Sequence, residues 1–169
     1  MRLPVPLVSF VLFCLGAPAA FADSKSVDLF HAKDWDVRLV TWDDGSSSCV
    51  AEVSYDNGDA FSIWRDRSHP IRLQFYSDGW SFGSDDSYAD VALEVDSHNS
   101  WKVTKADFYK NSVLIDLPTG PSADQFLAEI ESGDTLYLYD DKGKEQSSYS
   151  LAGSQASISA LNGCLGQLH

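Results

Sequence analysis

The chain is short of basic residues, with 12 Lys and Arg against 25 Asp and Glu among 169 residues. Nucleic-acid phosphates require basic patches, so this shortage argues against a nucleic-acid partner. It also disfavours binding to an anionic membrane surface. The field of such a chain would steer a basic partner or a divalent cation toward it, although solubility alone is the simplest role of the charge.

No apolar run reaches the roughly 20 residues of a transmembrane helix. The first residues instead resemble a secretory leader, with Arg2 followed by an apolar stretch from Leu7 to Leu15. The small-x-small pattern of Ala20-Phe21-Ala22 places the signal peptidase cut after Ala22. We therefore expect a signal peptide over 1–22 and a periplasmic or secreted single domain over 23–169. Loss of Arg2 would leave 11 basic against 25 acidic residues, a net charge of −14.

Cysteine is scarce, and the expected mature chain keeps only Cys49 and Cys164. In an oxidising compartment an isolated pair of cysteines usually forms a disulfide. A redox or metal role for the pair has less support, because the chain has no Cys-x-x-Cys and no histidine cluster beside either cysteine. The sequence therefore predicts a disulfide between an early strand and the C-terminal segment.

Period-two alternation of apolar and polar residues dominates the rest of the chain and predicts strands. The Asn57-Gly58 turn is a strong hairpin signal, because both residues tolerate positive φ. We expect strands over 35–39, 49–55, 61–65, 71–75, 80–82, 91–95, 101–105, 113–117 and 136–139, and one that ends near residue 151.

Two short helices complete the predicted fold. The first follows Ser122, a good N-cap that forms a capping box with Gln125, and Gly133 ends it. The second runs from Ser154, as N-cap, to Leu161. About nine strands and two helices predict a mainly β fold, an antiparallel β-sandwich or barrel-like domain.

Several short motifs stand out along the chain. They are Asp34-Trp35-Asp36-Val37 with Cys49 in the next strand, Leu93-Glu94-Val95-Asp96, Phe126-Leu127-Ala128-Glu129-Ile130 leading to Gly133-Asp134-Thr135-Leu136, and Tyr149-Ser150-Leu151-Ala152-Gly153-Ser154 before Ala156, Ile158, Ala160 and Leu161. With these motifs the chain from Trp35 to Cys164 resembles the invasion-associated locus B family of secreted proteobacterial proteins. The resemblance implies a β-rich periplasmic or surface protein with no known catalytic machinery, and it assigns no functional residue.

Catalytic and zinc motifs are weak. Ser154 follows Gly153, but a Gly-x-Ser-x-Gly elbow is absent, and the capping role explains this serine more simply. The histidines outside the leader are His31, His69, His98 and His169, and none has a second ligand at metal spacing. We predict no catalytic residue, no firm metal site and no cofactor.

An acidic loop is the one cation candidate. Asp78, Asp85, Asp86 and Asp90 lie close together in a turn-rich segment, and calcium takes such flexible carboxylate ligands. The spacing does not fit an EF-hand, and a solvated loop explains the same residues.

Tryptophans are plentiful, and their positions in the apolar–polar alternation of the strands separate them into two groups. Trp35 and Trp101 lie in phase with apolar neighbours and are expected in the core. Trp42 and Trp64 alternate out of step with their apolar neighbours and are expected on the outer face of the sheet. With Trp80, they are the predicted partner-binding aromatic residues.

These observations together predict a noncatalytic binding or interaction protein that recognises a basic protein partner. An inhibitor that plugs a basic cleft is one specific form of this hypothesis. Two alternatives stay open. A carboxylate-dependent hydrolase would need two convergent acids, and a carrier of a small apolar ligand would need an internal apolar cavity.

Overall fold

A single antiparallel sheet of ten strands forms the protein, with the strand order β1-β2-β3-β4-β5-β8-β7-β6-β9-β10. The computed structural model describes residues 24–67, 70–85, 87–96 and 100–168, so the predicted signal peptide lies outside the described residues. The strands are β1 (Ser24–Ala32), β2 (Trp35–Trp42), β3 (Ser47–Ser54), β4 (Asp59–Arg65), β5 (Arg72–Ser77), β6 (Tyr88–Val95), β7 (Ser100–Tyr109), β8 (Ser112–Asp116), β9 (Thr135–Tyr139) and β10 (Glu145–Ser150). The prediction of a mainly β fold is confirmed.

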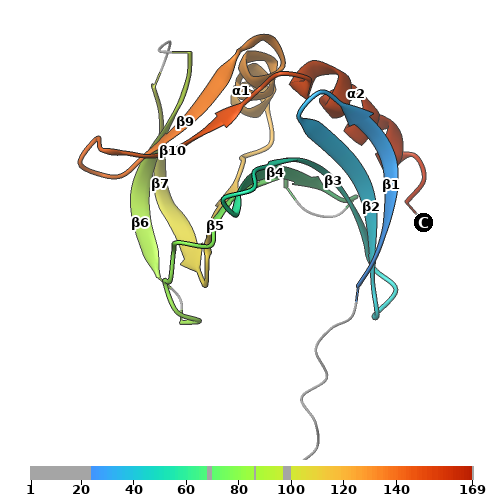
Figure 1. Cartoon of the computed structure of the whole chain (residues 1–169), viewed down its shortest axis with the longest axis horizontal. Helices are drawn as coiled ribbons and strands as arrows, with labels where there is room; N and C mark the ends of the chain where they lie inside the picture. Colours follow the sequence, from blue (N-terminus) through green and yellow to red (C-terminus); the bar gives the residue numbers. More distant parts are fainter. Residues whose placement is uncertain (1–23, 68–69, 86, 97–99, 169) are drawn as a thin grey trace, which may run out of the picture.

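The sheet curls so that β10, its last strand, comes back over β4 and β5, where Tyr149 packs on Phe61 and Phe75 (Figure 1). It does not close into a barrel, because β1 and β10 are its two edges. The end of β10 nevertheless reaches β2, where the Trp35 indole nitrogen donates to the Ser150 carbonyl at 3.1 Å. Within the described residues, neither helix is long and apolar enough to span a membrane.

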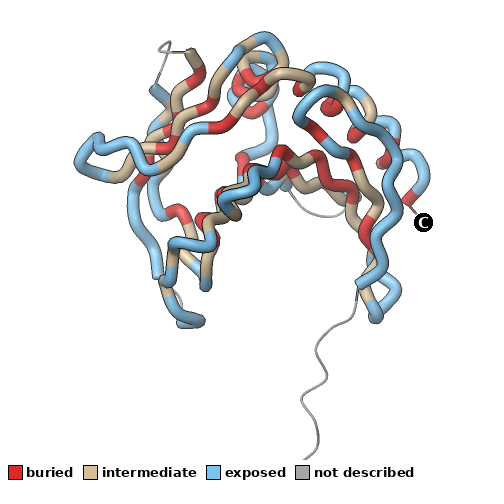
Figure 2. The backbone as a smooth tube through the Cα atoms, in the orientation of Figure 1, coloured by how far each residue is buried: buried red, intermediate tan, exposed pale blue. Residues whose placement is uncertain are grey.

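The inside of this curled sheet is filled by aromatic side chains from four strands. Trp35 (β2) meets Phe61 (β4) edge to face at 5.9 Å between ring centroids, and Phe61 stacks on Phe75 (β5) at 4.9 Å. Tyr149 (β10) lies 5.7 Å from Phe61 and 5.6 Å from Phe75. Figure 2 shows buried positions along β3, β4 and β9 and on both helices, whereas β1 is exposed over almost its whole length.

Helix α1 (Pro121–Ser132) buries Phe126 and Ile130, and Gly133 ends it as predicted. The predicted N-cap Ser122 and its capping box with Gln125 are wrong: Gly120 is the N-cap, two residues earlier, and the helix begins at Pro121. Proline suits the first helical position, since its missing N–H would have no intrahelical partner there.

Helix α2 (Ser154–Leu165) packs against β1, β2 and β3. The capping role predicted for Ser154 is wrong: Gly153 is the N-cap, and the buried Ser154 hydroxyl donates to the Ile130 carbonyl of α1 at 2.7 Å. The helix also continues past Leu161, because the burial of Leu161 and Cys164 outweighs the helix-breaking tendency of the Gly163 between them.

Two strand predictions need correction. Strand β1 was not predicted, because its residues are exposed and a register shift between Asp28 and Phe30 interrupts the alternation. Residues 80–82 form no strand; the Phe82 amide instead donates to the Lys110 carbonyl at 2.7 Å, in the turn between β7 and β8.

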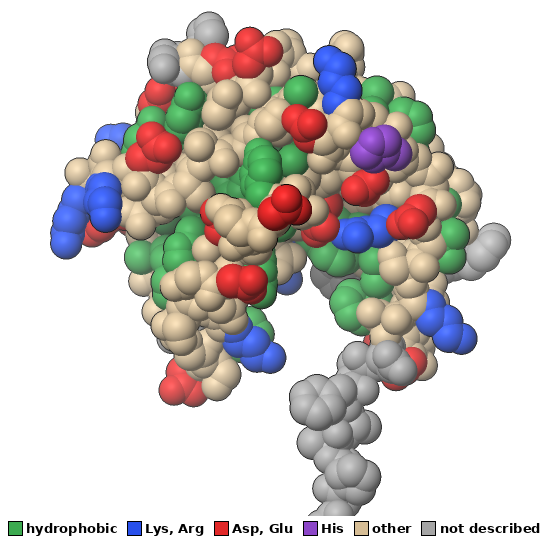
Figure 3. All heavy atoms as spheres, in the orientation of Figure 1, with side chains coloured by type: hydrophobic (Ala, Val, Ile, Leu, Met, Phe, Trp, Pro, Cys, Tyr) green, Lys and Arg blue, Asp and Glu red, His purple; other side chains and the backbone are tan. Residues whose placement is uncertain are grey.

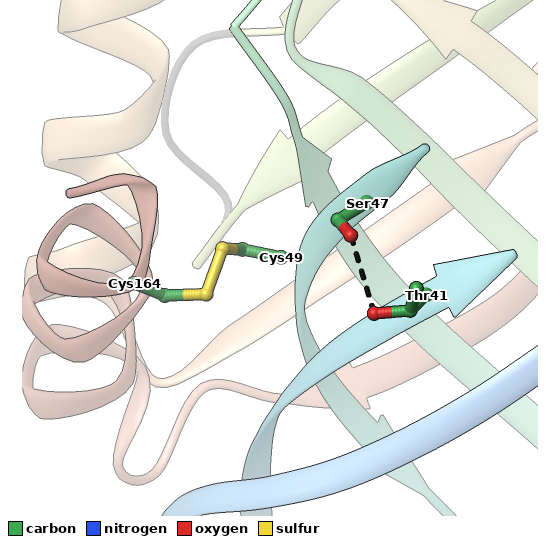
Figure 4. Close-up of a disulfide and its surroundings, with 4 residues drawn as sticks. All are labelled: Thr41, Ser47, Cys49 and Cys164. Carbon is green, nitrogen blue, oxygen red and sulfur yellow. Dashed lines mark hydrogen bonds between the residues drawn. A yellow bond between two sulfur atoms is a disulfide. The ribbon is translucent and has the colours of Figure 1, made fainter. Parts of the chain in front are cut away.

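Cys49 on β3 and Cys164 on α2 form the predicted disulfide, with 6.1 Å between their Cα atoms. Figure 4 shows the two side chains meeting between the strand and the helix, near the hydrogen bond of 3.2 Å between the Thr41 and Ser47 hydroxyls. The bond fixes the last helix to the inner side of the sheet.

We expect the double variant Cys49→Ser/Cys164→Ser to lose up to about 4–5 kcal/mol of unfolding free energy, because the bond closes a loop of about 115 residues in the unfolded chain. Urea unfolding followed by far-UV circular dichroism measures this loss. Reduction of the unaltered protein should produce a similar loss, and equal stability of the oxidised and reduced forms would contradict the structural role of the bond.

Gly153 begins α2 at a position that excludes a side chain. Its φ is +101°, and an added Cβ would come 2.1 Å from the Ala32 carbonyl oxygen. We expect Gly153→Ala to cost roughly 2–4 kcal/mol in the same unfolding experiment.

Gly163→Ala is the matched control, since it lies inside the same helix with no atom within 4 Å of the added Cβ. This variant should gain about 0.5–1 kcal/mol. Equal effects of the two substitutions would show that the start of α2 is not constrained as described.

Candidate functional site

The outer face of the sheet carries the side chains that alternate with the buried aromatic residues. The strand register places Trp64 (β4) between Val50 (β3) and Arg72 (β5), and it places Arg72 opposite Asp116 (β8). Because Phe61 faces inward, Trp64 three residues later faces outward. One cross-strand row of the outer face therefore reads Trp64, Arg72, Asp116.

Trp42, at the end of β2, joins this row by stacking on Trp64 with 6.5 Å between ring centroids and 28° between ring planes. The Trp64 indole nitrogen donates to the Ser62 hydroxyl at 2.8 Å, which fixes the orientation of the ring. Both tryptophans are half-buried, so part of each ring remains in contact with solvent. We call these two residues the tryptophan pair.

The tryptophan pair lines a pocket of about 690 Å³ together with Arg72 and Asp116. A smaller neighbouring pocket of about 300 Å³ includes Tyr88 of β6 and Asp107 of β7, and it shares Arg72, Leu114 and Asp116 with the first. The shared residues make the two pockets one groove across the outer face. In Figure 3 the molecule is hollowed between the β1–β2 side and the β6–β7 side, with hydrophobic and charged side chains on the walls of the hollow.

Arg72 and Asp116 form a bidentate ion pair in the middle of this groove. The Arg72 Nε lies 2.7 Å from one carboxylate oxygen of Asp116, and its Nη2 lies 2.9 Å from the other. This hydrogen bonding raises the pKa of the Arg72 guanidinium, so the group stays charged. The pair is solvent-accessible, with side chains 50% and 48% exposed.

Carboxylates outnumber cations in the two neighbouring cross-strand rows of this face. The rows are Asp28-Arg38-Val50-Trp64-Arg72-Asp116 and His31-Asp36-Glu52-Ser62-Gln74-Leu114-Asp107. Both arginines are already paired, since Arg38 donates to Glu52 at 2.6 Å and Arg72 to Asp116. His31 lies 2.8 Å from Asp36. These rows are net negative, which attracts cations to this face. The charged residues that line the two pockets balance, with Asp66, Asp107 and Asp116 against Arg67, Arg72 and Lys105.

The other predicted aromatic residues lie elsewhere. Trp80 packs on Phe82 at 5.7 Å and does not line either pocket. Trp35 is fully buried, as predicted for a core residue. Trp101 is half-buried; it packs on Phe126 at 5.5 Å, and its indole nitrogen donates to Glu129 at 2.7 Å.

The described carboxylates of the predicted calcium loop accept hydrogen bonds from other groups or face solvent. Asp78 accepts from the Tyr76 hydroxyl at 2.6 Å, Asp90 accepts from the Lys105 amide at 3.1 Å, and Asp85 is exposed. Asp86 lies outside the described residues, as do His69, His98 and His169. Within the part of the chain that the structure describes, no three His, Cys, Asp or Glu residues are placed to hold a metal ion.

Sequence reasoning found the tryptophan pair but missed the ion pair beside it. The alternation in 71–75 places Arg72 on the polar side of its strand, but Asp116 follows 44 residues later. No local pattern links the two, because β5 and β8 become neighbours only through the order of the strands.

Comparison with models of protein families, with curated proteins and with solved structures gave no match for this chain. The function must therefore be argued from its own residues.

The outward position of the tryptophan pair predicts a small effect of its removal on stability. We expect Trp42→Ala to cost about 1 kcal/mol of unfolding free energy, because it loses one half-exposed aromatic contact. Trp35→Ala should cost about 3–5 kcal/mol, because it empties the core. Urea unfolding of both variants measures the difference, and a Trp42→Ala cost equal to that of Trp35→Ala would place Trp42 in the core instead.

Proposed function

We propose that this is a noncatalytic binding protein that receives a basic protein segment in the groove beside the tryptophan pair. The single observation that carries the proposal is the solvent-accessible stack of Trp42 and Trp64 beside Asp116, in a pocket of about 690 Å³. An aromatic ring attracts Lys and Arg by cation–π interaction, and a neighbouring carboxylate adds a charge-assisted hydrogen bond.

The charge of the whole chain supports a basic partner. Acidic residues outnumber basic ones by 25 to 12, and the rows of the outer face repeat this imbalance locally. Such a field speeds the approach of a cationic partner and weakens as salt rises. A hollowed surface also suits receiving a segment better than plugging the cleft of another protein, so the inhibitor-like form has less support.

The two alternatives have weaker support. A carboxylate-dependent hydrolase needs one carboxylate as acid and another as base or nucleophile, whereas in the groove both oxygens of Asp116 accept hydrogen bonds from Arg72. A carrier of apolar molecules needs an apolar cavity, whereas serine, arginine and aspartate side chains contribute to the lining of the larger pocket.

We further propose that the protein works in the periplasm or outside the cell. The bond between Cys49 and Cys164 supports this location, because disulfides persist in oxidising compartments. The predicted leader over 1–22 agrees with it.

The experiment uses residues 23–169 and two probes, acetylated and amidated hexa-arginine and hexa-glutamate. We expect isothermal titration calorimetry at low salt to show binding of hexa-arginine alone, with affinity falling at 0.5 M salt. Trp64→Ala should weaken this binding about tenfold, which corresponds to the loss of a partly desolvated cation–π contact.

Trp101→Phe is the matched control, since Trp101 packs on Phe126 and lines neither pocket. This variant should bind like the unaltered protein. Equal binding of both probes, or full binding by Trp64→Ala, would refute the proposed function.

A further inference from the structure

The groove already holds an arginine of its own in the position that a basic ligand would seek. Both carboxylate oxygens of Asp116 accept hydrogen bonds from Arg72, at 2.7 and 2.9 Å. On the other side, the register makes Arg72 the cross-strand neighbour of Trp64. A carboxylate that accepts two parallel hydrogen bonds from one guanidinium is an arrangement by which proteins recognise arginine.

The position of this ion pair in the groove makes it an obstacle to such a ligand. Arg72 and Asp116 line both pockets, so a segment that crosses the groove meets them in the middle. Their side chains are about half exposed, so solvent screens the attraction between them and a ligand guanidinium can compete for Asp116.

We propose that Arg72 is an internal competitor, and that an arginine of the ligand takes its place on Asp116. The inference rests on the proposed function and adds two things to it. It names the ligand group as a guanidinium, and it assigns Arg72 the role of lowering the affinity so that only segments with a well-placed arginine bind.

The preference for arginine over lysine follows from the geometry of the exchange. Arg72 satisfies both oxygens of Asp116 with two parallel N–H donors. A ligand guanidinium replaces both bonds at once, whereas the ammonium of lysine is a point charge that does not reproduce the fork. Hexa-arginine should therefore bind more tightly than hexa-lysine of the same charge.

A second arginine on the same face provides a matched control. Arg38 pairs with Glu52 at 2.6 Å but lines neither pocket. Arg38→Gln and Arg72→Gln change the net charge of the protein equally, so a nonspecific electrostatic gain would appear in both. A gain that depends on Asp116 should appear in Arg72→Gln alone.

The experiment is calorimetric titration of hexa-arginine and hexa-lysine into residues 23–169 and the variants, with circular dichroism to verify folding. We expect Arg72→Gln to bind hexa-arginine about fivefold more tightly, the size of one exposed ion pair, and Arg38→Gln to match the unaltered protein. Asp116→Asn should weaken the binding of hexa-arginine more than Glu52→Gln does. Adding Arg72→Gln to Asp116→Asn should not restore the lost affinity.

The outcomes separate this inference from the proposed function. If Arg72→Gln binds more weakly, or no more tightly than Arg38→Gln, while Trp64→Ala still loses affinity, Arg72 is no competitor but the groove still binds the segment. If neither the unaltered protein nor Arg72→Gln binds either probe, the inference and the proposed function both fail. Binding of hexa-arginine by Arg72→Gln alone would support the role of Arg72 as a competitor and would contradict the proposed function of the unaltered protein.

Discussion

The alternation of side chains across the sheet, set by the buried aromatic cluster, is the constraint on which the rest of the structure depends. Trp35, Phe61 and Phe75 face inward and meet Tyr149 from β10. A slip of one residue in any of these strands would move its whole apolar set to solvent, so burial fixes the register. The same register leaves Trp64 on the outside as a consequence.

Two contacts keep α2 and the last strand on the inner side of this sheet. The bond between Cys49 and Cys164 ties α2 to β3, and the Trp35 indole holds the end of β10 at the Ser150 carbonyl. The outer face of β2, β4, β5 and β8 carries the tryptophan pair and the ion pair of Arg72 with Asp116. The proposed binding role therefore depends on how the core is filled, although none of its residues belongs to the core cluster.

The sequence predicts this fold where local chemistry determines the structure. Alternation located most strands, and the Asn57-Gly58 turn joins β3 to β4 with Gly58 at a φ of +84°. Strand β1 was missed because edge strands need not bury one face, and its bulge interrupts the alternation. Ser154 was misjudged because a buried partner, the Ile130 carbonyl, outweighs its local capping preference.

The site was predictable only in part for the same reason. The phase of Trp42 and Trp64 indicated the outer face, but their stacking depends on the three-dimensional pairing of β2, β3 and β4. The ion pair in the groove depends on β8 lying next to β5, an order of strands that alternation does not encode.

The central claim is that Trp35 faces the core whereas Trp42 and Trp64 face outward. Hydroxyl-radical footprinting tests it most directly, with oxidation of the folded and unfolded protein compared by mass spectrometry. The account predicts that Trp42 and Trp64 are oxidised in the folded state, because both rings keep contact with solvent, while Trp35, with 0% of its surface exposed, is protected. Oxidation of Trp35 at the rate of Trp42 and Trp64, or protection of all three, would contradict it.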